Sequence, residues 1–243
     1  MGNKGTKKTE SNALLDGPDY TCTWLHRHQA PRCLLFFAGW GMDSKPFSPL
    51  ASGGLDVCML SNYQRLVPPQ LPELAGYEEV HLLAWSFGVW VASQVAVGSL
   101  RSLCKTALAL GGTLNPVHER YGLAPERFAA MLAGCSEESV LAFYSSMFDE
   151  PRHLASFLAV RPQRGPDDLQ KELVTLYNGS MRSRASIDIF THHCITGRDR
   201  IFAGRNQIRA WGREDDSRVF PWPHFPFYQF NTWRELLETL RFS

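Results

Sequence analysis

The segment Val80–Ala92, VHLLAWSFGVWVA, constrains the fold of this chain more than any other. The apolar run up to Trp85 predicts a buried strand, and an apolar helical pattern begins directly after Ser86. A serine at such a turn is typical of a nucleophile elbow, in which small residues two positions before and after it keep strand and helix from colliding. Gly88 meets this condition, and Ala84 stands where the pattern has glycine. A buried serine with no chemical role is the alternative.

A second strand and its loop lie upstream of the elbow. The apolar run Cys33–Phe37 predicts a buried parallel strand, and glycines on both sides of Trp40 follow it. A loop of this kind turns backbone amides into a cleft, so the amides of Trp40 and Phe87 are the predicted oxyanion hole. The alternative is an ordinary turn with the indole packed on the core.

Chain order indicates which residues assist the serine, since this architecture presents Ser, then Asp or Glu, then His. Thr191–Gly197 predicts a late strand, and Asp199 follows it at the edge where sites of open α/β sheets form. His224 is the one histidine of the sequence beyond that strand, although a surface imidazole in a proline-rich loop is the alternative for it. Asp199 is the predicted acid and His224 the predicted base. The competing acids are Asp188, Asp215 and Asp216.

The chain resembles the BioG family of pimeloyl-acyl-carrier-protein methyl ester esterases of biotin synthesis. The likeness runs from about Thr23 to the C-terminus and rests on Phe36–Asp43, Ala84–Trp90, Asp199–Phe202 with Asn206 and Gln207, and His224–Phe227. It implies an α/β-hydrolase fold, a serine esterase mechanism, and a pimeloyl methyl ester carried on the phosphopantetheine arm of an acyl carrier protein. Ser86 would attack the ester, His224 would move the proton and Asp199 would orient the imidazole, so no metal or organic cofactor is required.

The order of elements agrees with an α/β fold built on a mostly parallel, doubly wound sheet with flanking helices. The predicted strands before the cap are Thr21–His26, Cys33–Phe37, Val57–Leu60, the elbow strand and Thr106–Leu110. Helical spacing at Glu126–Ala133, Ser136–Phe148 and Pro166–Tyr177 predicts a helical cap at about residues 115–184, inserted after the nucleophile half. Residues 1–18 are polar and predicted to be a flexible extension, so the hydrolase domain is 19–243.

Composition excludes some classes of function. With 243 residues, 20% charged residues and a net charge of +1, one soluble domain is expected and bulk nucleic-acid binding is not. No apolar stretch has the length of a membrane span, and the N-terminus has no hydrophobic signal-peptide core, so the expected location is the cytoplasm. The six cysteines form no C-x-x-C pair, which favours reduced, buried thiols.

Arginines indicate where an acidic acyl carrier protein would dock. Arg152, Arg161 and Arg164 lie between Pro151 and Pro166 with no acidic residue among them, and they are the predicted partner-binding residues. Solvated surface arginines are the alternative. Since triad residues do not encode the acyl group, a thioesterase or an esterase of small free esters also remains open, and so does a binding module without turnover.

Overall fold

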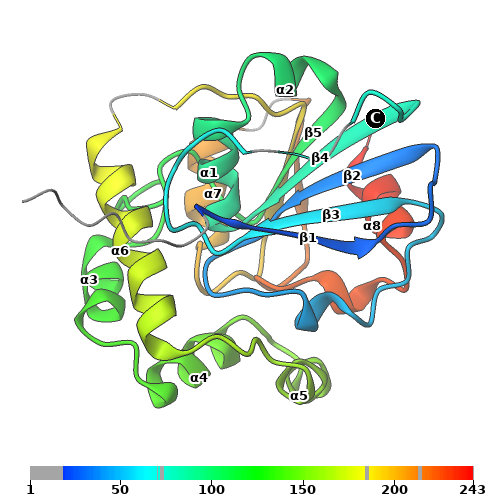
Figure 1. Ribbon diagram of the computed structural model, residues 1–243. Coiled ribbons are helices and arrows are strands. Elements are labelled where there is room, and N and C mark those ends of the chain that lie inside the picture. Colours follow the sequence, from blue (N-terminus) through cyan, green and yellow to red (C-terminus); the bar gives the residue numbers. More distant parts are fainter. Residues whose placement is uncertain (1–18, 70, 72–73, 184–185, 213–214, 243) are drawn as a thin grey trace, which may run out of the picture.

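The computed structural model describes residues 19–69, 71, 74–183, 186–212 and 215–242. The predicted extension, residues 1–18, lies outside the described residues. Within them, the chain forms a mostly parallel sheet of seven strands with helices on both faces (Figure 1), which confirms the predicted fold class.

The strands lie side by side in the order β1-β3-β2-β4-β5-β6-β7. The edge strand β1 is antiparallel to β3, and the other pairs of described strands are parallel. The central strands are buried on both faces, which is why β2 and β4 are continuous apolar runs in the sequence. The bounds are β1 Thr21–His26, β2 Arg32–Phe37, β3 Asp56–Ser61, β4 Glu79–Trp85, β5 Cys104–Leu110, β6 His192–Thr196 and β7 Ser217–Phe220.

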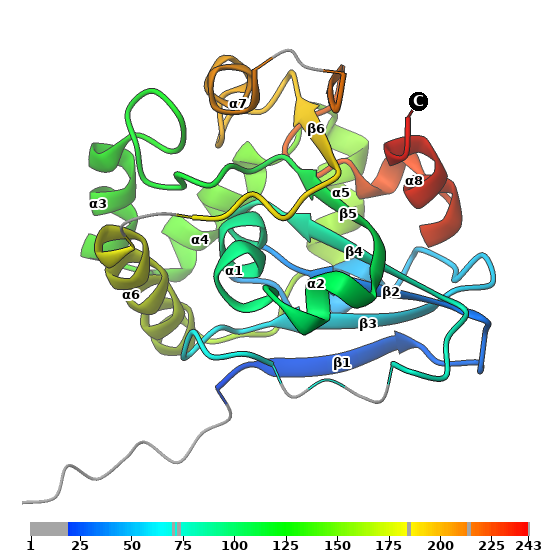
Figure 2. The ribbon, with the colours of Figure 1, turned by 90° about the horizontal axis from the view of Figure 1, so that it is seen from above.

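Helices cover the two faces of the sheet (Figure 2). One face carries α1 (Phe87–Val95), α2 (Ser99–Leu103) and α7 (Gly204–Trp211), and the other carries α8 (Trp233–Leu240) with the short 3-10 helices η1 (Lys45–Phe47) and η2 (Phe227–Gln229). The ring of Phe36 points to the second face, where its centroid is 5.0 Å from that of Phe47 and 5.1 Å from that of Trp233. This aromatic packing fixes η1 and α8 against the sheet.

Four helices of the described chain lie between β5 and β6 and are called the cap here. The bounds are α3 Pro125–Ala133, α4 Glu137–Ser146, α5 Pro151–Ala159 and α6 Pro166–Arg182. Figure 1 shows α3, α4 and α6 beyond the end of the strands at which β4 ends and α1 begins, whereas α5 lies below the strands in that view. Three of the four helices start with proline at the first helical position, where its missing N–H costs no hydrogen bond.

Some elements differ from the prediction. Helix α5 was not predicted, and Pro151 begins it. Helix α6 continues past the predicted end at Tyr177 and includes Gly179. The helix passes so close to Leu66 at this point that a Cβ on Gly179 would lie 2.4 Å from Cδ1 of Leu66. The elements α2, α7 and β7 were not predicted either. The strand β7 has two exposed central residues and therefore no apolar run.

The six cysteines, all within the described residues, are free thiols. Cys22 on β1 is exposed, in contrast to the expected burial, and its Sγ lies 3.2 Å from Sγ of Cys58 on β3. The hydrogen bond from Cys58 lowers the pKa of the Cys22 thiol to about 7. The two thiols form a close pair on the antiparallel edge of the sheet.

Candidate active site

Ser86 occupies the sharp turn between β4 and α1 with φ 58° and ψ −129°. A positive φ is strained for a residue with a side chain, and such strain persists where the surroundings enforce it. The crossing is tight: a Cβ on Gly88 would lie 2.2 Å from the carbonyl oxygen of Phe37, and one on Gly112 would lie 2.2 Å from that of Ser86. Ala84 is fully buried in β4, so its methyl group is accommodated where the pattern has glycine. The turn therefore has the predicted elbow geometry.

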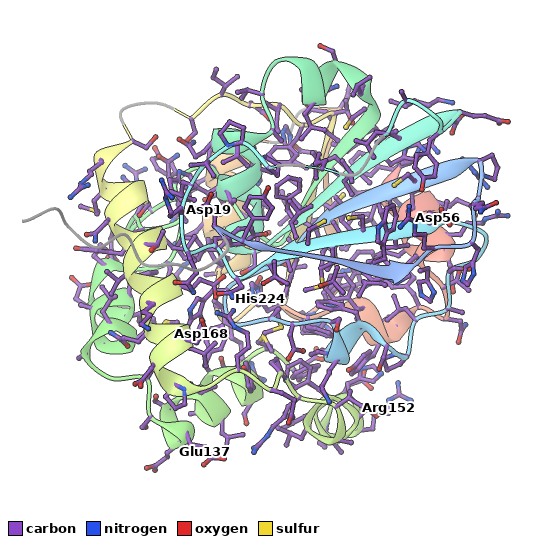
Figure 3. The ribbon with its side chains drawn as sticks, viewed as in Figure 1. Asp19, Asp56, Glu137, Arg152, Asp168 and His224 are labelled. Atoms are coloured by element: carbon purple, nitrogen blue, oxygen red, sulfur yellow. The ribbon has the colours of Figure 1, made fainter. Side chains whose placement is uncertain are left out.

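His224 lies in the connection between β7 and η2 and is 1% exposed. Oγ of Ser86 lies 2.9 Å from Nε2 of its imidazole, and Oδ2 of Asp199 lies 2.7 Å from Nδ1. The indole N–H of Trp85 donates to the carbonyl oxygen of His224 at 2.7 Å, and the ring of Phe202 is nearly parallel to the imidazole, at 7°. Figure 3 shows His224 near the centre of the molecule. The predicted nucleophile, base and acid are thus brought together.

Asp199 follows β6 and is held by its own loop. Its Oδ1 accepts hydrogen bonds from the backbone amides of Ile201 at 2.8 Å and Phe202 at 2.9 Å. Its Oδ2 accepts from Oγ1 of Thr196 at 2.8 Å and from Nε2 of Gln207 at 3.2 Å. These donors fix the carboxylate so that it faces His224, and they leave Nε2 of the imidazole free to accept the Ser86 proton.

The competing acids lie elsewhere. Asp188 accepts a hydrogen bond from Nε2 of His193 at 2.9 Å, and Oδ1 of Asp216 is 3.5 Å from Nδ1 of the same ring. Asp215 is exposed. The ring of His193 is stacked on Trp211 of α7 at 4.1 Å. Asp188, Asp216, His193 and Trp211 form a separate cluster at the start of β6, which makes no contact with Ser86 within the described chain.

The backbone amides of Trp40 and Phe87 flank Ser86. A Cβ on Gly39 would lie 2.9 Å from Cβ of Ser86, which shows how closely the loop after β2 approaches the serine. Phe87 is the first residue of α1, so its amide has no carbonyl one turn earlier to bind. The amide of Trp40 donates to no acceptor within the described part of the chain. Neither amide has a backbone acceptor among the described residues.

The cap contributes a charged residue that the sequence analysis did not single out. Glu172 on α6 is fully buried, and it contacts the loop that contains Trp40 through the amide of Gly41. Burial raises the pKa of the Glu172 carboxyl, while Arg164 opposes this shift by favouring the ionised form. The four-residue spacing of Asp168 and Glu172 was a signal in the sequence that these two side chains lie on one side of a helix, and Arg164 lies just before that helix.

The structure separates the three predicted docking arginines. Arg152, labelled in Figure 3, is exposed and pairs with Glu150 at 2.6 Å. Arg161 is partly exposed and pairs with Glu137 at 3.1 Å. Arg164, in contrast, has a side chain only 8% exposed. Its guanidinium group forms ion pairs with Asp168 and Glu172 and is not exposed to a docked protein. The prediction of Arg164 as a docking residue is therefore corrected.

Comparisons with known proteins agree on the family. The family model described as pimeloyl-ACP methyl esterase BioG matches residues 22–236. A crystal structure of BioG from Haemophilus influenzae superposes with a TM-score of 0.79 at 26% identity, covering 89% of this chain and 99% of that chain. A lipase-esterase related protein from Clostridium acetobutylicum has a TM-score of 0.59 at 15% identity, covering 92% of this chain and 99% of that one, which shows the shared α/β-hydrolase fold.

A curated relative adds a chemical context. A Bacteroides fragilis protein named malonyl-[acyl-carrier protein] O-methyltransferase is 34% identical over 178 residues. The match covers 73% of this chain but only 36% of the relative, so the chain spans about a third of that protein.

The described residues contain neither a membrane-spanning helix nor a metal-binding cluster. No helix among them is long and apolar enough to cross a membrane. In the same part of the chain, no three side chains of His, Cys, Asp or Glu are grouped so that they could hold a metal ion.

Proposed function

Because the chain belongs to the BioG family, we propose that it hydrolyses the methyl ester of pimeloyl-acyl-carrier protein to pimeloyl-acyl-carrier protein and methanol in biotin synthesis. The observation that carries the proposal is the continuous hydrogen-bond series from Oγ of Ser86 through the imidazole of His224 to Asp199, with distances of 2.9 and 2.7 Å. Support for a carrier-bound methyl ester comes from the family description and from the name of the Bacteroides fragilis relative.

The first half of the proposed reaction forms an acyl-enzyme. Oγ of Ser86 attacks the ester carbonyl carbon while Nε2 of His224 takes the hydroxyl proton. The carbonyl oxygen becomes negatively charged and is stabilised by the amides of Trp40 and Phe87. When the tetrahedral intermediate collapses, the bond to the methoxy group breaks and His224 returns the proton, so that methanol leaves. Asp199 stabilises the imidazolium between these two proton transfers.

The second half repeats this chemistry with water. His224 takes a proton from a water molecule, whose oxygen attacks the acyl carbon of the Ser86 ester. The same two amides stabilise the second oxyanion, and the proton returns to Oγ of Ser86 as the free carboxyl group leaves. The acid product stays attached to the carrier protein through its other end.

The proposed macromolecular partner is the acyl carrier protein that bears the substrate. Arg152 and Arg161 are the exposed candidates for contact with its acidic surface. The proposed location of this activity is the cytoplasm, which rests on the sequence-based expectation.

Methanol release from purified pimeloyl-acyl-carrier-protein methyl ester tests the function. Wild-type enzyme is expected to release one methanol per ester, and Ser86→Ala to lose at least about a thousandfold in kcat, because only binding and oxyanion stabilisation remain. A fluorophosphonate should label Ser86 in the wild type, as located by peptide mass spectrometry, and circular dichroism should show an unchanged fold in the variant. Full activity in pure Ser86→Ala would overturn the serine mechanism, and the absence of methanol release by wild-type enzyme would overturn the substrate.

A further inference from the structure

The carboxylate of Glu172 joins the cap to two segments of the sheet domain. It lies on α6 and is 0% exposed. Oε2 accepts a hydrogen bond from the amide of Gly41 at 3.1 Å, and Oε1 accepts one from the amide of Tyr63 at 3.0 Å. Arg164 donates to Oε2 through Nη1 at 2.5 Å. Each oxygen of this buried carboxylate therefore has a backbone partner, and its charge has a buried counterion.

Further contacts hold the same loop from both sides of Trp40. The hydroxyl group of Tyr63 donates to the carbonyl oxygen of Ala38 at 3.0 Å, and that of Tyr144 on α4 donates to the carbonyl oxygen of Gly41 at 3.2 Å. The indole N–H of Trp40 donates to the carbonyl oxygen of Leu169 on α6 at 3.0 Å. The loop after β2 is thus fixed by side chains and backbone of the cap, while the amide of Trp40 is left without an acceptor among the described residues.

Gly41 has a left-handed backbone conformation in this loop. Its φ of +78° is accessible to glycine at little cost, and glycine also populates other conformations readily. The amide of Gly41 and the carbonyl group of Trp40 belong to one peptide plane, which adjoins the plane that holds the Trp40 amide. The two planes share the Cα of Trp40, so a displacement of the Gly41 amide that carries this atom with it also moves the Trp40 amide. A hydrogen bond to a buried, charged acceptor restricts that displacement.

We propose that Glu172 is a positioning residue for the oxyanion hole: by holding the Gly41 amide it keeps the Trp40 amide directed at the oxygen that becomes charged beside Ser86. This inference rests on the proposed ester hydrolysis. Glu172 does not touch the substrate, and its effect passes through the backbone of Gly41. Because the oxyanion exists only in the transition state and the intermediates, loss of this contact lowers kcat and leaves KM almost unchanged.

The variant Glu172→Asp tests this role with little change in charge. The shortened side chain withdraws the carboxylate by one carbon–carbon bond, so it can no longer reach both amides. The flexible side chain of Arg164 is able to follow the carboxylate, whereas the amide of Gly41 is not. Asp168→Asn is the matched control, since Asp168 lies one turn earlier on α6 and also pairs with Arg164, at 2.7 Å, but makes no hydrogen bond to the loop after β2 within the described residues.

Three measurements separate positioning from a general structural effect. With 4-nitrophenyl butyrate, Glu172→Asp is expected to lose about ten- to a hundredfold in kcat, less than the roughly 10²–10³ lost when an oxyanion donor is removed, and KM should stay within about twofold. The inhibition constant of an alkyl trifluoromethyl ketone, whose adduct with serine carries the same negative oxygen, should rise by the same factor. The pH midpoint of kcat/KM should not move, because His224 and Asp199 are untouched.

Asp168→Asn is expected to stay within about twofold of wild type in both constants. If Glu172→Asp does not fold, Tyr144→Phe removes the hydrogen bond to the carbonyl oxygen of Gly41 without altering a charge, and it should show the same split with a smaller loss. Folded variants of Glu172 or Tyr144 with unchanged kcat and ketone affinity would overturn the positioning role while the esterase function stands. A wild-type enzyme that neither hydrolyses esters nor reacts with fluorophosphonate would overturn the proposed function, and this inference with it.

Discussion

Oδ2 of Asp199 lies 2.7 Å from Nδ1 of His224, although the two residues are 25 positions apart in the sequence. The carboxylate does not depend on the imidazole for its orientation, because four other groups of its own segment also donate to it. Asp199 is thus held independently of His224, and it imposes one tautomer on the imidazole.

Replacement of Asp199 by asparagine should therefore reverse that tautomer. If the amide oxygen keeps the backbone donors of Ile201 and Phe202, the amide nitrogen faces Nδ1 of His224, and Nε2 then carries the proton and cannot accept one from Ser86. We expect a loss in kcat of about ten-thousandfold, as for a serine protease that loses its orienting carboxylate. Asp188→Asn is the control and should keep near-wild-type turnover, since Asp188 contacts His193 instead. Greater damage from Asp188→Asn would show that the acid is wrongly assigned.

Docking of an acidic carrier protein at Arg152 and Arg161 should depend on the salt concentration. We expect kcat/KM for the carrier-bound ester to fall as ionic strength rises, while hydrolysis of 4-nitrophenyl butyrate stays nearly constant. The double variant Arg152→Glu and Arg161→Glu should impair only the carrier-bound substrate. Lys105→Glu is the control, because Lys105 is an exposed cation near the start of β5, at the opposite end of the strands from the cap. Equal losses on both substrates would remove the case for this docking surface.

Arg164 should matter for stability. Arg164→Met leaves the buried carboxylate of Glu172 without its counterion, and breaking a buried pair in this way costs about 3–5 kcal/mol. Urea denaturation should show this decrease in the free energy of unfolding. Arg152→Met is the comparison. Arg152 and Glu150 form a solvent-exposed ion pair, so loss of the Arg152 charge should lower the free energy of unfolding by no more than about 1 kcal/mol. Equal stability of the two variants would contradict the assignment of Arg164 to the buried network.

The Cys22 thiol should react at unusually low pH. Its pKa is lowered to about 7 by the hydrogen bond from Cys58, so the thiolate predominates above that pH and the neutral thiol below it. The rate of alkylation of the folded protein by iodoacetamide, followed by intact mass, should have its midpoint near pH 7. Cys58→Ala removes the donor and should move the midpoint up toward about 8.5, the value of a free cysteine. A midpoint that is the same in both proteins would exclude the hydrogen bond as the cause.

Local pattern was enough to predict the elbow, the strand before it and the order of the three predicted triad residues. Ser86 stands at a change from an apolar strand to an apolar helix, and Asp199 directly follows a strand, so neighbours in the sequence define both places. Burial of charge could not be predicted in this way. Arg164 was grouped with Arg152 and Arg161 because no acid lies between Pro151 and Pro166, yet its partners Asp168 and Glu172 come after that window. Arg164 and Glu172 are buried together as a pair, although they lie eight positions apart. A count of charges along one segment does not record such a pairing.

The cap is one uninterrupted stretch of chain between β5 and β6, and such insertions are often pictured as units that can be exchanged between related enzymes. Here α4 and α6 supply hydrogen-bond partners to Trp40 and Gly41 in a loop that precedes them by about a hundred residues. A transplanted cap that fits the sheet but lacks these partners would leave the loop after β2 unsupported. A cap exchanged into this sheet keeps these contacts with Gly41 only if it carries an acceptor where Glu172 stands and a hydroxyl group where Tyr144 stands.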